Sequence, residues 1–190
     1  MLEKLDIAST ALVLIDLQEG ILNFSFSPYS GQAVRSAGAE LAKGFRAAGG
    51  LVVLTRVVYA SDFADALQQP VDNPLPSGAL PSNWSVFSPE LAVSAEDLIV
   101  DKRNWGAFYG TDLELQLVRR GIKTIVIGGV ATNMGVESTA RDAHERNYDL
   151  IFADGAISSM SEDMHRFAMG TIFPLIGRIR SVGDVLGALK

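Results

Sequence analysis

The chain has 190 residues, of which 48% are hydrophobic and 20% are charged, a composition that is ordinary for a globular protein. Its net charge of −6 argues against nucleic acid as a partner, because phosphate binding needs a basic face, and the absence of cysteine excludes thiol chemistry. No apolar run approaches the ~20 residues that span a bilayer, and the first residues do not resemble a signal peptide, so we expect a cytoplasmic protein without a membrane contact.

The first predicted element is a buried strand over residues 10–16, which ends on the carboxylate of Asp16. A helix is predicted over residues 30–48, because apolar residues recur there every four positions. The apolar positions of this helix are Ala33, Ala37, Leu41 and Phe45. A second buried strand is predicted over residues 51–58.

Residues 59–97 interrupt the alternation of strands and helices. They hold five of the seven prolines, together with the aromatic residues Trp84 and Phe87. The five prolines are Pro70, Pro74, Pro76, Pro81 and Pro89. A connection of this length is typical of a lid or a contact surface, and the plain alternative is an excursion over the surface. We expect this segment to form a symmetric contact in a homo-oligomer, a dimer or a tetramer.

The chain then returns to regular structure. A short third strand over residues 99–100 leads to Lys102, and a helix over residues 111–120 ends at Gly121. A lone lysine after a strand is usually solvated, so its position alone does not indicate a function.

Residues 124–142 contain a buried strand, a glycine-bearing turn and a helix. The strand is predicted over residues 124–127, and Gly128 and Gly129 are expected to end it. The helix is expected to start near Thr132 or Asn133, either of which can cap its first N–H groups. Backbone N–H groups at such a turn favour a negative oxygen, so the turn is a candidate anion site.

The last predicted elements are a strand over residues 150–153, a helix capped by Ser161, a strand over residues 179–180 and a helix over residues 182–189. This alternation predicts an α/β doubly wound fold, with a parallel sheet and helices on both faces. We expect one domain over residues 1–190, with its ligand site at the carboxyl ends of the strands.

Three motifs carry a family resemblance: D-L-Q-E-G-I from residue 16, K-R-N-W-G-A-F-Y-G-T-D-L from residue 102, and G-V-A-T-N-M-G-V-E-S-T-A-R-D from residue 129. Together they resemble the isochorismatase-like (cysteine hydrolase) superfamily, and in particular its cysteine-less branch. The resemblance covers nearly the whole chain. It implies a six-stranded sheet of order 3-2-1-4-5-6 and a small-molecule substrate.

The resemblance also implies roles for individual residues. Asp16 and Lys102 correspond to the catalytic Asp–Lys pair of the family, and Gly135 stands where its nucleophilic cysteine would be. On position alone, Asp16 would more simply cap a neighbouring N–H. The resemblance further implies a cis peptide between Val130 and Ala131, with the N–H groups of Ala131 and Gly135 forming an oxyanion site.

A substrate pocket is expected around these three residues. The candidate substrate-binding residues are Gln18, Trp105, Phe108, Tyr109, Val130 and Ala131. Any of the three aromatic residues can equally belong to the core. No cofactor or metal is expected, because His144 and His165 lack the spacing of metal ligands and residues 55–62 lack the D-x-H zinc motif of related nicotinamidases.

Without a thiol, two functions remain. The first is hydrolysis, of a vinyl ether or a related bond, with Asp16 as general acid or base. Such an acid must keep its proton near neutral pH. Burial raises the pKa of an aspartate and an adjacent ammonium lowers it, so the sequence leaves the balance open. The alternative is a non-catalytic or regulatory protein that binds a small molecule and has lost the nucleophile.

Overall fold

The computed structural model describes residues 2–73 and 79–190, and its strands form one parallel sheet in the order β3-β2-β1-β4-β5-β6. The strands are β1 (Thr10–Ile15), β2 (Leu51–Val57), β3 (Leu98–Lys102), β4 (Thr124–Val130), β5 (Asp149–Ser158) and β6 (Arg178–Ser181). The predicted doubly wound α/β fold and its strand order are therefore confirmed.

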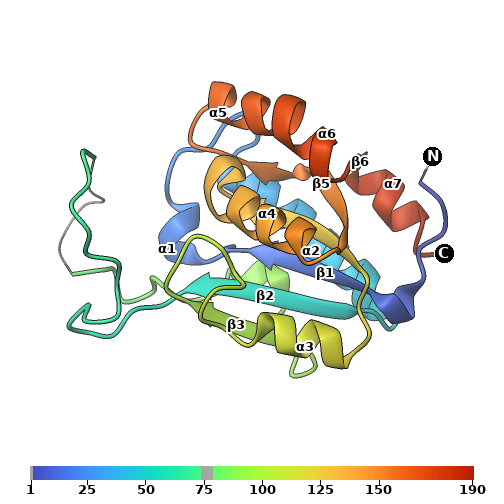
Figure 1. Ribbon diagram of the computed structural model, residues 1–190, viewed down its shortest axis with the longest axis horizontal. Coiled ribbons are helices and arrows are strands. Elements are labelled where there is room, and N and C mark those ends of the chain that lie inside the picture. The colour runs from blue at the N-terminus through green and yellow to red at the C-terminus, as the bar shows by residue number, and fades with distance from the viewer. Residues whose placement is uncertain (1, 74–78) are drawn as a thin grey trace.

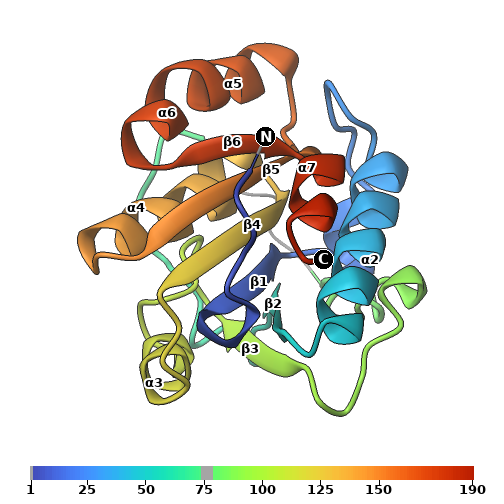
Figure 2. The ribbon, with the colours of Figure 1, turned by 90° about the vertical axis from the view of Figure 1, so that its right-hand side faces the viewer.

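Helices cover both faces of the sheet. The α-helices are α1 (Glu19–Leu22), α2 (Gly31–Ala47), α3 (Leu113–Arg119), α4 (Glu137–Glu145), α5 (Glu162–Phe167), α6 (Phe173–Ile176) and α7 (Val182–Gly187). The 3-10 helices are η1 (Ile7–Ser9) and η2 (Pro89–Leu91), and the π-helices are η3 (Thr132–Val136) and η4 (Ala168–Ile172). Figure 2 shows α2 and α7 on one face of the sheet and α3, α4 and α6 on the other. Over the described ranges, no helix is long and apolar enough to cross a membrane.

The hydrophobic core consists of two layers, one on each face of the sheet. Successive residues of a strand point to opposite faces, so β1 contributes to both layers. Ala11, Val13 and Ile15 face one layer, whereas Leu12 and Leu14 face the other. All five are at most 1% exposed, which makes β1 the centre of the fold and fixes the position of Asp16 directly after it.

Strands β4 and β5 are longer than predicted. Gly128 and Gly129 do not end β4 but pair with Leu14 and Ile15 of β1, and β4 continues to Val130. The helical region starts at Thr132 with η3, as expected, but neither Thr132 nor Asn133 caps it. No side chain caps the start of η3 or of α4. The hydroxyl of Thr132 and the amide of Asn133 instead contact His165 and Ser159.

The proline-rich segment leaves the sheet after β2, and in Figure 1 it extends away from the body of the molecule. Its described residues form no helix or strand before η2. Pro74 and Pro76 lie outside the described residues. Trp84 and Phe87 are half-buried against their own chain, so these two aromatic residues are not freely available for the expected subunit contact. Trp84 Nε1 donates to the carbonyl of Val57 at 3.0 Å. The exposed apolar side chains of this segment include Leu67 and Val71.

Candidate active site at the carboxyl ends of the strands

Asp16 directly follows β1, in the left-handed region with φ of 54°, which aspartate tolerates better than most residues. Its side chain is almost completely buried and has two partners. Thr55 Oγ1 donates to Oδ1 at 3.1 Å, and Lys102 Nζ donates to Oδ2 at 2.7 Å. Thr55 comes from β2 and Lys102 from the end of β3, so three neighbouring strands hold this carboxyl group in place.

The ammonium group of Lys102 is fully buried. Besides Asp16, it donates to the carbonyl oxygens of Asn104 at 2.9 Å and Trp105 at 3.0 Å. An ammonium group has three N–H donors, so these contacts occupy all of them. Lys102 therefore fixes both the carboxylate and the loop that follows β3.

Burial dominates the protonation equilibrium of Asp16. The charges and hydrogen bonds of Lys102 and Thr55 favour the carboxylate, yet desolvation by burial outweighs them and raises the pKa of Asp16 above its ordinary value of 3.8. The structure thus resolves the balance that the sequence left open. A carboxyl group with a raised pKa keeps its proton to a higher pH and is suited to donate it.

The turn after β4 brings Gly135 against this carboxyl group. The Val130–Ala131 peptide bond is cis, as the resemblance implied, and η3 follows it. A Cβ atom built on Gly135 would lie 3.2 Å from Asp16 Oδ2 and 3.3 Å from the carbonyl oxygen of Trp105. The structure therefore brings Asp16, Lys102 and Gly135 together. Val130 and Ala131 are both buried beside them.

Two of the expected substrate-binding residues have other contacts. The Gln18 amide is fully buried: its Nε2 donates to the carbonyls of Val57 and Trp84, and its Oε1 accepts from the N–H of Val57 at 2.7 Å. These contacts occupy all of its donors and attach the Trp84 segment to β2, so Gln18 has a structural contact and not the expected substrate contact. Phe108 packs in the core against Tyr148, 6.1 Å between ring centroids.

The other two aromatic candidates are exposed on the loop after Lys102. The side chain of Trp105 is 52% exposed and that of Tyr109 is 78% exposed. The backbone of this loop is held from both sides, since Trp105 O accepts from Lys102 and Tyr109 O accepts from Asn104 Nδ2 at 3.2 Å. Both rings are thus exposed on a loop whose backbone is fixed.

The structure adds two residues that the motifs did not single out. Thr55 is one of two polar residues of β2, with Arg56, and pairs in register with Ile15. A hydroxyl residue within a strand predicted to be buried was the signal available in the sequence. Tyr59 follows β2, and burial together with the negative charges of Asp16 and Asp65 raises the pKa of its phenol. No local pattern distinguishes Tyr59 from a core aromatic residue.

Thr139 is excluded as a free nucleophile by its contacts. Its hydroxyl donates to the carbonyl of Gly135 at 2.7 Å and accepts from the N–H of Ala107 at 3.1 Å. The buried hydroxyl group instead ties η3 to the loop after β3. Within the part of the chain that the structure describes, no three histidine, cysteine, aspartate or glutamate side chains are grouped so that they could hold a metal ion.

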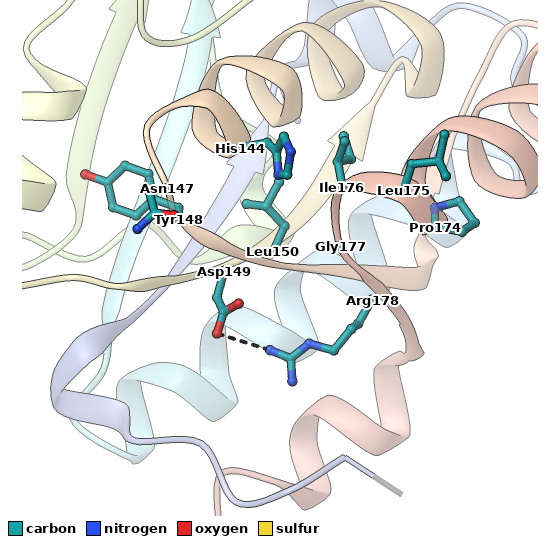
Figure 3. A pocket seen from close by; sticks show the side chains of 10 residues that line it. All are labelled: His144, Asn147, Tyr148, Asp149, Leu150, Pro174, Leu175, Ile176, Gly177 and Arg178. Carbon is teal, nitrogen blue, oxygen red and sulfur yellow. Dashed lines mark ion pairs between the residues drawn. The ribbon is translucent and has the colours of Figure 1, made fainter.

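Two surface hollows lie away from this site. The one drawn in Figure 3, of about 410 Å³, is lined by residues at the start of β5 and around α6, with an ion pair of 3.6 Å between Arg178 and Asp149. The other, of about 340 Å³, lies beside the start of β2. Both are at the amino ends of strands, the edge opposite Asp16.

Comparisons with known proteins agree on one family. A family model described as the isochorismatase domain matches residues 10–184. The isochorismatase family protein YecD of Escherichia coli O157:H7 is 50% identical over 186 residues, covering 98% of this chain and 99% of its own length. YwoC of Bacillus subtilis is 45% identical, covering 98% and 97%. The structure of an isochorismatase family protein from Burkholderia thailandensis superposes with a TM-score of 0.95 at 44% identity, covering 100% and 99%.

Proposed function

The chain belongs to the isochorismatase family of hydrolases, and we propose that it hydrolyses a small molecule with Asp16 as general acid and Lys102 as its electrostatic partner. One observation carries this proposal. The Asp16 carboxyl group is buried and has a raised pKa, and its Oδ2 lies beside Gly135, which has no side chain of its own. Because Gly135 offers no nucleophile beside it, the Asp16 carboxyl group is the reactive group that this proposal assigns to the site.

The favoured substrate is a vinyl ether. Protonated Asp16 transfers its proton to the outer alkene carbon, and the ether carbon becomes an oxocarbenium ion. The Asp16 carboxylate then takes a proton from water as that water adds to the cationic carbon. The resulting hemiketal collapses to a ketone and an alcohol: Asp16 gives its proton to the leaving oxygen and takes the proton of the hemiketal hydroxyl group, which regenerates the acid. Lys102 stabilises the carboxylate between these steps.

An ester or amide is the related alternative within the same site. Water is the nucleophile, because the chain has no cysteine and Gly135 offers no side chain. The backbone N–H groups of Ala131 and Gly135 are then the proposed donors to the carbonyl oxygen as it becomes negative. This reaction needs Asp16 as a base, so the pH dependence of the rate separates the two substrate classes.

A panel of vinyl ethers, esters and amides, assayed with purified protein, tests the proposed function. We expect turnover of at least one vinyl ether above the rate in buffer, and loss of that turnover in Asp16→Asn. The missing nucleophile favours the alternative of a binding protein. That alternative gains support if no compound is hydrolysed while one of them raises the thermal unfolding temperature of the protein.

We also propose that the protein forms a homo-oligomer through residues 59–97. Leu67 and Val71 are 61% and 62% exposed on this extended segment, and a subunit contact would remove their apolar surface from water. Light scattering at micromolar concentration should give a multiple of the 20.3 kDa protomer mass. Replacing Leu67 and Val71 with aspartate should lower that mass. The control is Leu115→Asp on α3, an exposed leucine outside the segment, and a monomeric wild type would contradict the proposal.

A further inference from the structure

A second buried polar contact lies behind the turn that carries Gly135. Thr132 is the first residue of η3 and is fully buried, and its Oγ1 lies 2.8 Å from Nδ1 of His165 on α5. His165 is only 7% exposed. Gly135 faces Asp16, whereas Thr132 faces α5, so this pair holds the turn from outside the proposed site. It is not a nucleophile–base pair, because a substrate has no access to the buried hydroxyl.

The surroundings of His165 determine its charge. Tyr29 packs edge-on against its ring, with 6.0 Å between centroids, and the Tyr29 hydroxyl donates to Asp154 of β5 at 3.1 Å. The negative charges of Asp154 and of Glu162 on its own helix favour the imidazolium ion, yet burial outweighs them and lowers the pKa of His165 below 6.5. The π-helices η3 and η4, which lie beside α5, contain no charged residue that could act on His165. His165 is therefore neutral at neutral pH.

The same stretch of η3 has one more anchor. Asn133 Oδ1 accepts a hydrogen bond from Ser159 Oγ at 2.5 Å, just after β5. The first two residues of η3 are thus attached through their side chains to α5 and to the end of β5. The N–H groups of Ala131 and Gly135 are on the backbone that these two contacts hold.

We propose that neutral His165 is a positioning residue, which accepts a hydrogen bond from Thr132 and thereby fixes the turn that presents the N–H groups of Ala131 and Gly135. The inference rests on the proposed function of that turn. Protonation puts a hydrogen on Nδ1, which can then no longer accept from the Thr132 hydroxyl. The Nδ1–H group can then only donate to Thr132 Oγ1, so the contact reverses its direction, the hydroxyl proton is left without its acceptor, and the hydrogen bonding of the turn changes.

Nuclear magnetic resonance tests the coupling without any substrate. The chain has two histidines, and the spectrum of His144→Gln assigns the remaining ring signals to His165. In a pH titration of ¹⁵N-labelled protein, His165 should titrate below the ordinary value of 6.5, with Nδ1 as the unprotonated nitrogen of its neutral ring. The amide signals of Ala131 and Gly135 should shift with the midpoint of His165. The proposal would be overturned if the amide signals of Ala131 and Gly135 did not shift with the titration of His165. It would also be overturned if Nδ1 carried the proton in the neutral ring.

Matched variants give the kinetic test. Thr132→Val keeps the shape of the side chain and removes the hydroxyl, and we expect kcat to fall roughly 10–100-fold with a smaller change in KM. Thr132→Ser keeps the hydroxyl and should restore most of kcat, while His144→Gln should have no effect. A fully active Thr132→Val protein would show that the contact is merely structural.

The two proposals fail in distinguishable ways. If the wild type hydrolyses nothing, the proposed function fails, and the amide titration still decides whether His165 controls the turn. If the wild type is active and its Ala131 and Gly135 amides do not follow His165, only the positioning role fails. Should Thr132→Val not fold, the titration of the wild type alone determines whether the positioning role holds.

Discussion

Replacing Asp16 with asparagine should lower the rate of hydrolysis at least ~100-fold, the low end for removing a general acid or base. Asparagine has nearly the same shape, but its single oxygen can replace only one of the two acceptors that Thr55 and Lys102 use, and it cannot donate an acidic proton. The rate should be compared with that of the wild type on the best substrate of the panel. An Asp16→Asn protein with wild-type activity would contradict the mechanism.

The control for this substitution is the adjacent carboxylate Asp101. It precedes Lys102, is exposed and pairs with Arg56 at 2.6 Å, so it has the same charge without touching the site. Asp101→Asn should change the rate less than about twofold, since exposed ion pairs contribute little. Circular dichroism of both variants then distinguishes loss of chemistry from loss of fold.

The pH dependence of the rate follows from the raised pKa of Asp16. A general acid acts in its protonated form, which exists below the folded-state pKa, so the rate should be constant at low pH and fall as the pH rises through that value. Because burial raises the pKa, the fall should begin above the ordinary value of 3.8. A rate that instead rises through this range would identify the carboxylate as a base acting on water.

Substitution of Thr55 provides an independent way to shift the pH range over which the rate falls. Its hydroxyl donates to the charged form of Asp16 and so lowers the pKa. Thr55→Val keeps the volume and removes the donor, so the fall of the rate should shift to higher pH. If the rate of Thr55→Val falls at the same pH as that of the wild type, a group other than Asp16 controls the rate.

The predictable part of the site is the part that the order of the strands determines. Asp16 and Lys102 each follow a buried strand, and in a parallel sheet all carboxyl ends lie at one edge, so their proximity could be expected. Thr55 and Tyr59 reach the region from β2 and the segment after it, and His165 reaches it from α5. A polar residue in a buried strand was the one sequence signal for Thr55. The roles of Tyr59 and His165 depend on which side chains meet in space, and no pattern in the sequence contains that information.

Motifs proved less specific for individual contacts than for the family. The D-x-Q start suggested a substrate contact for Gln18, yet its side-chain amide forms hydrogen bonds with backbone groups of Val57 and Trp84. A sequence motif identifies residues that occur together in the members of a family. It does not separate a residue that touches the ligand from one that holds a loop beside it.

The predicted helix over residues 30–48 shows how a period is misjudged. A spacing of four residues suggested a face with Ala33 and Ala37, but the structure buries Val34 and Gly38 in their place. A helix repeats every 3.6 residues, so a strict spacing of four drifts off the buried face. Leu41 and Phe45 were correct because two large apolar side chains set that face more strongly than alanines do.

The end of β4 was misjudged because two glycines usually interrupt a strand. Gly129 has φ of 116°, in the region that favours glycine, and it pairs with Ile15 of β1. Glycine is needed there because the backbone of β1 approaches too closely for any side chain. That requirement comes from a partner more than a hundred positions earlier in the chain, and local propensity cannot reveal it.

Gly129→Ala should therefore destabilise the protein by more than about 4 kcal/mol, in the exceptional range for a single substitution. Its Cβ would lie 2.5 Å from the N atom of Ile15 and still closer to the carbonyl oxygen of Ile15. Neither is the end of a flexible side chain, so β1 and β4 must separate at the centre of the sheet. The separation would also displace Asp16, the residue that directly follows β1. Urea unfolding monitored by circular dichroism measures the loss, or shows that the variant does not fold.

Two other glycines separate the clash from the backbone strain. Gly49 also has a positive φ, of 74°, but nothing lies within 4 Å of its Cβ position, so Gly49→Ala should cost only the ~1–2 kcal/mol of a left-handed residue. Gly170 in η4 has the same open space without a positive φ, and Gly170→Ala should be neutral or slightly stabilising. If Gly129→Ala cost no more than Gly49→Ala, the close approach of β1 to β4 would not be what requires glycine at this position.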